Sequence, residues 1–455
     1  MTELPDVLAR GDRARLFPVL ADTSKEGRTL SIFLSCFELV PELGRALLAS
    51  LDIRVGARAQ IETYTEVVLK KGDQAAAFRP DGLIIMKAGG KTWSALVEAK
   101  VGNSELTREQ VEAYLELARL NGIDALITLS NQFASLPTHH PVNVSLSARK
   151  KVQLFHWSWM YVVTQSILLL SDEEVEDREQ RLLLREMNRF LLHASSGVRG
   201  FDQMPASWSE VVSRVHAGGN VSAGSQEARE IVGAWHQEVG DLSLVLSRQL
   251  ETTVKVRMPR AHAADPLERQ KADQRILAEN AQLTTELAVP DTVDTIKVCV
   301  SLRSRSITLS MWLKSPDEPK GAKARLNWLL RQLQKTDPTG VHIRCFWPGK
   351  TKFTQHSLSA LREDPDLVAA GHEGQALVSF EVLMVKDLAI RLAQRKLFLT
   401  ELESMAPKYY FEVAQHLKPY QAKAPRLAQE KVLPEQVAPE ALREEAELEA
   451  LAGEV

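Results

Sequence analysis

Two adjacent glycines, Gly89 and Gly90, constrain the fold of this chain more than any other feature of its sequence. They separate two runs rich in apolar and β-branched residues, at positions 78–86 and 92–101. A Gly-Gly pair is a favoured two-residue loop between antiparallel strands, so the sequence predicts a β-hairpin here. The loop also sets the register of the hairpin, that is, which residues face each other across it.

The predicted register places Asp81 directly opposite Glu98, with Lys100 two residues further along the same face. Directly opposed side chains have Cβ atoms about 4.5–5.5 Å apart, where two like charges destabilise a sheet. A divalent cation would compensate, since Mg²⁺ or Mn²⁺ prefers carboxylate oxygens, and the backbone carbonyl of Ala99 could complete its coordination. Lys100 could then orient or help deprotonate an attacking water, or neutralise charge that develops on a phosphate.

The runs around this hairpin predict an α/β arrangement. Apolar residues recur at helical spacing before the hairpin and again after it, and Gly122 is a helix stop. Shorter runs rich in β-branched residues predict strands. The expected order is helix, three strands, helix and strand, at residues 28–51, 61–69, 78–86, 92–101, 107–121 and 123–129.

The hairpin residues resemble a known motif. Pro80-Asp81 on one strand and Glu98-Ala99-Lys100 on the next are similar to the PD-(D/E)XK motif of restriction-endonuclease-like nucleases, whose αβββαβ core has the same order of elements. The resemblance covers about residues 25–165. It implies that Asp81 and Glu98 bind the metal and that Lys100 is catalytic. The alternative is a solvated hairpin face whose charges simply balance.

Three more residues fit the same superfamily. Gln110 and Tyr114 resemble the Q-x-x-x-Y element of its exonuclease-like branch, and Glu26 resembles an acid that many members contribute from the first helix. Each also has a structural interpretation. Thr107 and Gln110 form a capping box, Tyr114 fits a core position, and Glu26 favours the helix dipole without any metal. The sequence leaves both interpretations open.

Charged residues also lie around this core. Glu62 and Glu66, on the strand before the hairpin, are expected at the surface or behind the metal ligands. A long polar loop at 131–151 ends in three consecutive cations, and loops of this length are often functional. These cations would suit a phosphate backbone or a solvated loop end: Arg149, Lys150 and Lys151.

The length of 455 residues predicts two or three domains, and 44% hydrophobic with 25% charged residues is the composition of ordinary soluble protein. The three cysteines are isolated, and no run reaches the roughly 18 apolar residues of a membrane span, so we expect a cytoplasmic protein. The expected parts are a nuclease domain at 1–200, a helical connector at 201–290, a basic α+β domain at 291–420 and an acidic Pro/Glu-rich tail at 421–455.

Charge is concentrated in the predicted α+β domain. The whole chain has a net charge of −3, whereas 291–420 holds 19 basic and 14 acidic side chains. A β-meander is predicted at 282–314. Phosphate contact with aromatic stacking, or a protein or homodimer surface, would suit the cations and the tryptophan that this region carries: Arg303, Arg305, Trp347, Lys350 and Lys352.

Together these features predict a Mg²⁺-dependent nuclease that hydrolyses DNA phosphodiester bonds through a water positioned between the metal and Lys100, with RNA as the alternative substrate. The superfamily resemblance implies defence against foreign DNA first and DNA repair second. The competing hypothesis is a nuclease-like core without turnover, which serves as a nucleic-acid or protein adaptor in a stress response.

Overall fold

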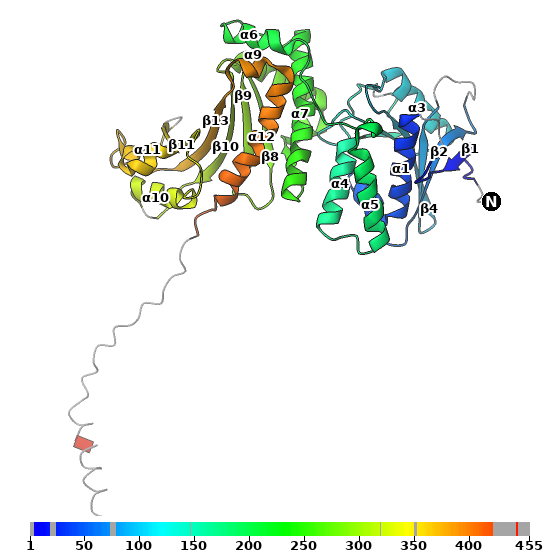
Figure 1. Cartoon of the computed structure of the whole chain (residues 1–455), viewed down its shortest axis with the longest axis horizontal. Coiled ribbons are helices and arrows are strands. Elements are labelled where there is room, and N and C mark those ends of the chain that lie inside the picture. Colours follow the sequence, from blue (N-terminus) through cyan, green and yellow to red (C-terminus); the bar gives the residue numbers. More distant parts are fainter. Residues whose placement is uncertain are drawn as a thin grey trace, which may run out of the picture. The chain divides into compact units, whose positions relative to one another are not determined.

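The structure is a computed structural model that describes residues 4–18, 24–72, 79–145, 147–318, 320–349, 353–421 and 443–444. The chain divides into two units, Met1–Pro419 and Tyr420–Val455. The first unit is mixed α/β and holds two β-sheets with their covering helices (Figure 1). The acidic tail expected at 421–455 lies almost entirely outside the described residues. Within the described ranges, no helix is long and apolar enough to cross a membrane.

The first sheet has six strands in sequence order within the described chain. Its first four strands pair antiparallel, and the last two continue from the fourth in parallel. The predicted order of helix, three strands, helix and strand is confirmed, and a first strand that the sequence analysis did not predict precedes it. The strands are β1 (Leu8–Arg13), β2 (Gln60–Leu69), β3 (Gly82–Ala88), β4 (Lys91–Ala99), β5 (Ala125–Ser130) and β6 (Gln153–Ser158).

The predicted hairpin and its register are both confirmed. β3 and β4 pair from Gly82 opposite Val97 to Ala88 opposite Lys91. Gly89 and Gly90 make the turn with φ values of 54° and 79°. Positive φ at both central residues matches the right-handed twist of the strands, and glycine adopts it without a Cβ penalty.

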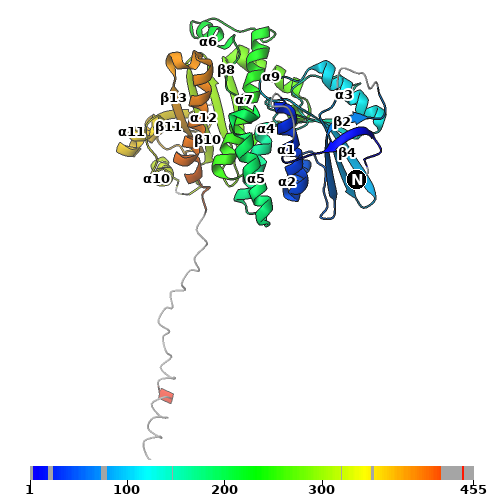
Figure 2. The same ribbon diagram turned by 45° about the vertical axis from the view of Figure 1, so that its right-hand side comes forward.

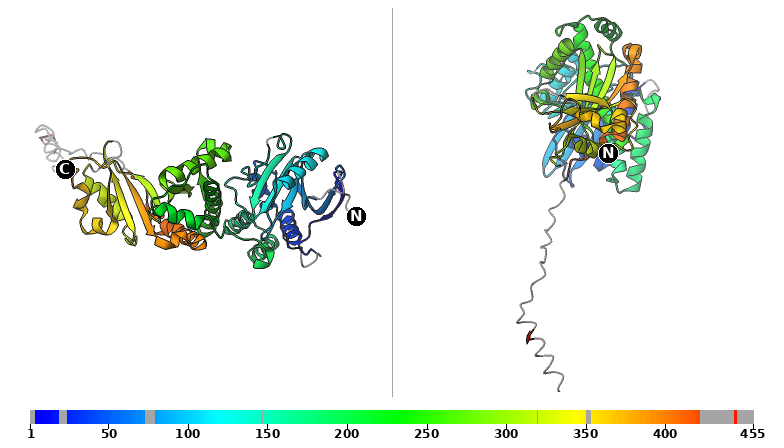
Figure 3. Two further views of the ribbon diagram at one scale, coloured as in Figure 1. Left: turned by 90° about the horizontal axis from the view of Figure 1, so that it is seen from above. Right: turned by 90° about the vertical axis from the view of Figure 1, so that its left-hand side faces the viewer.

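Helices cover both faces of the first sheet, because residues of each strand alternate between the two faces. Ala95, Val97 and Ala99 pack with α1, whereas Leu96 packs with α3. In the left view of Figure 3, α1 (blue) and α3 (cyan) lie on opposite sides of the sheet. The helices are α1 (Lys25–Leu39), α2 (Pro41–Ala49) and α3 (Arg108–Asn121), followed by α4 (Trp159–Ser171) and α5 (Arg178–Leu191).

The second sheet is antiparallel and has seven strands among the described residues, in the order β12-β11-β13-β10-β9-β8-β7. The predicted meander is confirmed as β8, β9 and β10. The bounds are β7 (Lys255–Arg257), β8 (Gln282–Ala288), β9 (Ile296–Ser301), β10 (Ser306–Lys314), β11 (Val341–Phe346), β12 (Phe353–Ser357) and β13 (Ser379–Asp387).

Helices of the second sheet share one hydrophobic core with it, which runs from Met204 to Leu417. Figure 2 shows α7 and α12 side by side against this sheet. The helices are α6 (Trp208–His216), α7 (Gln226–Leu250), α8 (Arg260–Ala264), α9 (Pro266–Asn280), α10 (Ala322–Gln332), α11 (Leu358–Glu363) and α12 (Arg395–Glu412), with short 3₁₀ turns at Ala194–Ser196, Pro365–Ala369, Ala389–Ala393 and Ala414–His416.

The segment expected as a connector, 201–290, is therefore an integral part of the second sheet's body. It supplies two of the strands, β7 and β8, and two fully buried tryptophans, Trp208 and Trp235. The apolar sides of α6 and α7 are buried in the core that includes both tryptophans. Burial of such large side chains stabilises the packed state over a free linker.

Candidate active site

The hairpin end opposite the glycine turn brings two carboxylates together. Asp81 immediately precedes β3, and Glu98 lies on β4 at the predicted register. Asp81 Oδ2 accepts a hydrogen bond of 2.9 Å from the backbone N–H of Ala99. The Glu98 residue is only 1% exposed, and its Oε2 atom has no hydrogen-bond partner within the described part of the chain. A buried carboxylate oxygen without a partner is unfavourable and calls for a ligand or a proton.

Burial makes both acids hard to ionise. Desolvation raises the pKa of Asp81 to about 6, against the opposing effect of the Ala99 N–H. Desolvation, and then the charge of Asp81, raise the pKa of Glu98 to about 8. The pair therefore favours binding a proton or a cation near neutral pH.

Lys100 joins Glu98 to α1. Its Nζ lies 2.7 Å from Glu98 Oε1 and 3.4 Å from Glu26 Oε2, so Glu26 reaches the site. Desolvation lowers the pKa of Lys100, but the charge and hydrogen bond of Glu98 outweigh it and the net pKa is raised. A protonated Lys100 can donate to a water or a phosphate oxygen but cannot take a proton from it.

The structure resolves the two interpretations of Gln110. Thr107 Oγ1 accepts a hydrogen bond of 3.2 Å from the Gln110 backbone N–H, so Thr107 caps α3. The side chain of Gln110, however, turns to the site, where Nε2 donates to Glu98 Oε1 at 2.7 Å and to the Tyr114 hydroxyl at 3.2 Å. Gln110 thus belongs to the site.

Tyr114 is both a core residue and a residue of the site. It is 1% exposed within the core under α3, and its hydroxyl donates to the carbonyl of Arg79 at 3.0 Å. Desolvation and the charge of Glu98 raise the pKa of Tyr114, which keeps it neutral. Tyr114 therefore packs the core with its ring and orders the site with its hydroxyl.

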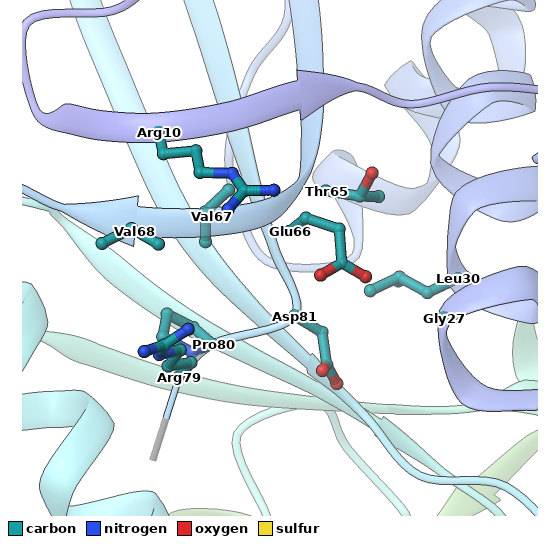
Figure 4. Close-up of a pocket in the computed structure, with 10 residues that line it drawn as sticks. All are labelled: Arg10, Gly27, Leu30, Thr65, Glu66, Val67, Val68, Arg79, Pro80 and Asp81. Carbon is teal, nitrogen blue, oxygen red and sulfur yellow. The ribbon is translucent and has the colours of Figure 1, made fainter. Parts of the chain in front are cut away.

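Glu66 is exposed, as expected, but the sequence did not predict its direction beside Asp81. It adopts a φ of 53°, which is rare for a residue other than glycine, and its backbone N–H donates to the carbonyl of Asp81 at 3.2 Å. Figure 4 shows its carboxylate directed toward that of Asp81. Glu62 lies four residues earlier on the same strand, and its Oε2 atom instead forms an ion pair with Lys87 Nζ at 3.0 Å. The alternation of residues along a strand cannot predict that these two acids have different surroundings, because a β-bulge sets the direction of the Glu66 side chain.

A cavity of about 130 Å³ adjoins Asp81 (Figure 4). Its walls come from β1, α1, β2 and the residues just before β3, and they include Arg10, Glu66 and Arg79. The lining is therefore charged, with guanidinium and carboxylate groups around one space.

Within the described ranges, no group of three or more His, Cys, Asp or Glu side chains is placed to hold a metal ion. Asp81 and Glu98 supply two carboxylates at this site, and the charges of Glu26 and Glu66 also act on Asp81. Ala99, predicted to contribute its carbonyl, contacts Asp81 through its backbone N–H.

The cations of the polar loop belong to a different part of the sheet. The loop leads into Gln153, the first residue of β6. Gln153 is paired with Ala125 on β5, and Ala125 is paired with Ala95 on β4, so the end of the loop is level with Ala95 rather than with Glu98. Earlier in the loop, Ser135 and His139 bond to Arg269 and to the carbonyl of Ala263, at 2.6 Å and 2.7 Å. Of the three predicted phosphate contacts, Lys150 and Lys151 are exposed and Arg149 is half-buried.

The residues of the second sheet that were predicted to contact phosphate lie only partly within the described chain. Arg303 and Arg305 lie in the turn between β9 and β10, as expected. Trp347 is 2% exposed and its ring stacks on His372 with centroids 4.4 Å apart, so it does not offer its ring to a base. The structure corrects that prediction because a residue distant in sequence covers the indole. Lys350 and Lys352 lie outside the described residues.

Comparison of the chain with known protein families, with curated proteins and with solved structures finds no match. The feature that carries most chemistry is the pair of the half-buried Asp81 and the buried Glu98, with Lys100 and Gln110 bonded to the same oxygen of Glu98.

Proposed function

We propose that this chain is a metal-dependent nuclease that hydrolyses phosphodiester bonds of DNA. The observation that carries the proposal is the opposed pair of the half-buried Asp81 and the buried Glu98, beside the protonated Lys100. A pair of this kind is a poor stabilising element, because the two carboxylates repel each other, burial removes their solvation and Glu98 Oε2 has no partner in the described chain. Strongly perturbed acids gathered at one end of a sheet are typical of a functional site.

The donor set fits a hard divalent cation such as Mg²⁺ or Mn²⁺. Asp81 and Glu98 would hold it, and Glu98 Oε2 has lone pairs that no hydrogen bond occupies among the described residues. Two protein carboxylates are enough for Mg²⁺, which keeps several waters and binds substrate phosphate through its other positions. When bound, such an ion polarises the phosphate and acidifies a water.

The residues of the chain have distinct tasks in this proposal. The Ala99 N–H fixes Asp81, and Gln110 fixes Glu98, so that both carboxylates keep their direction. Lys100 donates a hydrogen bond to a phosphate oxygen and offsets the negative charge of the transition state. Hydrolysis adds the oxygen of one water to phosphorus, breaks one P–O ester bond and returns a proton to the departing oxygen.

The test is cleavage of plasmid, linear duplex, single-stranded DNA and RNA with Mg²⁺, with Mn²⁺ and with a chelator. Asp81→Asn, Glu98→Gln and Lys100→Met are each expected to reduce the rate by about a hundredfold or more, because these groups act as a unit. Glu62→Gln and Lys87→Met are matched controls, since they form an exposed acid–lysine pair on adjacent strands of the same sheet. A Lys100→Met protein that cuts at the parental rate contradicts the mechanism.

The second candidate is a nuclease-like adaptor without turnover. The observation in its favour is that Lys100 already neutralises Glu98 directly, at 2.7 Å. Calorimetric titration with Mn²⁺ separates the candidates, because a silent core has no need to bind metal. Binding that Glu98→Gln removes favours the nuclease, whereas absence of binding favours the adaptor.

A further inference from the structure

The cavity beside Asp81 has a charged lining that the proposed chemistry does not yet use. Its volume of about 130 Å³ equals roughly four water molecules at ~30 Å³ each, which is room for one phosphate group. Arg10 and Arg79 contribute guanidinium groups to the walls, and Glu66 and Asp81 contribute carboxylates (Figure 4). A space lined in this way selects a small charged group over an apolar one.

Arg10 supplies this cavity with a cation that is available to a ligand. It is exposed, and across the described ranges its side chain makes no hydrogen bond or ion pair. Arg13, on the same strand, is by contrast bonded to Glu38 and to the Tyr64 hydroxyl. Lys100 is likewise engaged by Glu98 and Glu26. Arg10 can therefore bind a ligand without first breaking a contact.

The backbone directs Arg10 to this place. β1 and β2 pair with Arg10 opposite Val68 and Asp12 opposite Thr65, so a register shift lies between the two pairs. The extra residue of β2 makes a bulge, and a bulge redirects side chains. Glu66 takes its positive φ in this bulge. The result is that Arg10 and Glu66, from neighbouring strands, line the same cavity (Figure 4).

A nucleic acid that approaches the acid pair needs such a cation. Glu26, Glu66, Asp81 and Glu98 place four carboxylates near the expected position of the cleaved bond, and each repels the phosphate backbone. The planar guanidinium of arginine can bind a phosphate with two parallel N–H groups, a geometry that lysine lacks. An arginine next to the acids offsets this repulsion where it is strongest.

We infer that Arg10 binds a phosphate of the nucleic-acid backbone in this cavity, adjacent to the phosphate that is cleaved. The inference takes the identity of its ligand from the nuclease function proposed above. It makes β1 a substrate-binding element of the site, and Arg10 a residue that contributes to affinity rather than to the chemical step.

The experiment measures binding of a fluorescently labelled DNA duplex and its single strand at several salt concentrations, with Mg²⁺ present. The full chain carries Lys100→Met so that the DNA stays intact. Arg10→Gln is expected to weaken binding by about tenfold and to lower the slope of log affinity against log salt by about 0.7–0.9, the loss of one phosphate contact. Arg10→Lys should keep the slope and recover part of the affinity.

Arg58→Gln is the matched control, because Arg58 is exposed in the loop at the opposite end of β2. It should change neither affinity nor slope. In the active chain, Arg10→Gln should raise KM and leave kcat unchanged, a split that a merely structural role would not produce. Thermal melting shows whether Arg10→Gln is folded, and Arg10→Lys gives the answer if it is not.

The failures of the two proposals are distinguishable. Equal affinity and slope for Arg10→Gln and Arg58→Gln, or a parent chain that binds no DNA at low salt, overturns the phosphate subsite. A parent chain that binds DNA through Arg10 but cleaves no substrate with Mg²⁺ or Mn²⁺ overturns the nuclease and leaves the subsite standing.

Discussion

The side-chain amide of Gln110 donates a hydrogen bond of 2.7 Å to Glu98 Oε1. Because this contact leaves Glu98 Oε2 without a hydrogen-bond partner among the residues that the structure describes, it sets the direction in which the carboxylate can bind a cation. Residues that hydrogen-bond to a metal-binding side chain and orient it typically contribute 10–100-fold to metal affinity or activity.

We therefore expect Gln110→Ala to reduce the cleavage rate by about tenfold or more and Gln110→Glu to reduce it further, since it adds a like charge next to Glu98. Steady-state cleavage with Mg²⁺ is the measurement. Glu109→Gln, one residue earlier on the exposed side of α3, is the control. A Gln110→Ala protein with the parental rate and metal affinity would show that the contact has no orienting role.

Metal binding should become stronger as the pH rises. The cation needs both carboxylates ionised, and the pKa values of Asp81 and Glu98 are raised to about 6 and about 8. Protons therefore compete with the metal below these values, and the apparent affinity for Mn²⁺ should increase through both. Calorimetric titration across this range is the measurement. A pH-independent affinity would contradict the placement of the metal on these acids.

A buried acid on α7 should make the metal-free protein less stable in alkali. Glu238 is 0% exposed, and both of its carboxylate oxygens are without a hydrogen-bond partner in the described residues. Desolvation, then the charges of Glu403 and Asp241, raise its pKa well above the usual value of a glutamate. An acid whose folded pKa is raised holds its proton longer when folded, so its contribution to stability is present at low pH and is lost as the pH rises.

Glu238→Gln is thus expected to increase the free energy of unfolding at alkaline pH by about 1–3 kcal/mol, because the amide stays neutral where the buried carboxyl must either keep its proton or ionise without a partner. It should have little effect in acid, where Glu238 is already neutral. Denaturant unfolding at both pH values measures the difference. Glu230→Gln, on the same helix but at the surface, is the control. An equal effect at the two pH values would show that ionisation of Glu238 is not the cause.

A substitution of Glu66 by glycine should increase the stability of the fold and decrease activity. Its φ of 53° favours glycine, so Glu66→Gly is expected to stabilise the fold by up to about 1 kcal/mol. The same change removes a carboxylate from the cavity beside Asp81 and should lower metal affinity or cleavage. Glu62→Gly is the control, because Glu62 lies in the regularly paired part of β2 and should lose stability. Loss of stability in both variants would mean that the bulge is not strained.

The parts of the fold that the sequence predicts correctly are those with a local cause. Gly89-Gly90 determines both a turn and a register, and Thr107 and Gly122 cap one helix at its two ends. The predicted opposition of Asp81 and Glu98 follows from the register alone.

The parts that sequence reasoning missed depend on distant partners. β1 carries no alternating pattern and becomes a strand because the edge of β2 is available to pair with it. That pairing creates the bulge at Glu66 and brings Arg10 to the cavity. Trp347 is covered by His372, and Trp208 and Trp235 draw the expected connector into a core. No pattern of neighbouring residues in the sequence predicts these contacts, because the partners are far apart along the chain.

β4 is bonded on both sides, to β3 antiparallel and to β5 in parallel, and its residues from Ala95 to Ala99 are buried. Amide protons in such a strand exchange with solvent only when a large part of the sheet opens, on the slowest time scale of the molecule. Glu98 therefore cannot retreat from Asp81 by local breathing of the backbone. The repulsion between the two carboxylates therefore favours binding of a positive ion, either a proton or, in the function proposed above, a divalent metal, rather than a change of backbone conformation.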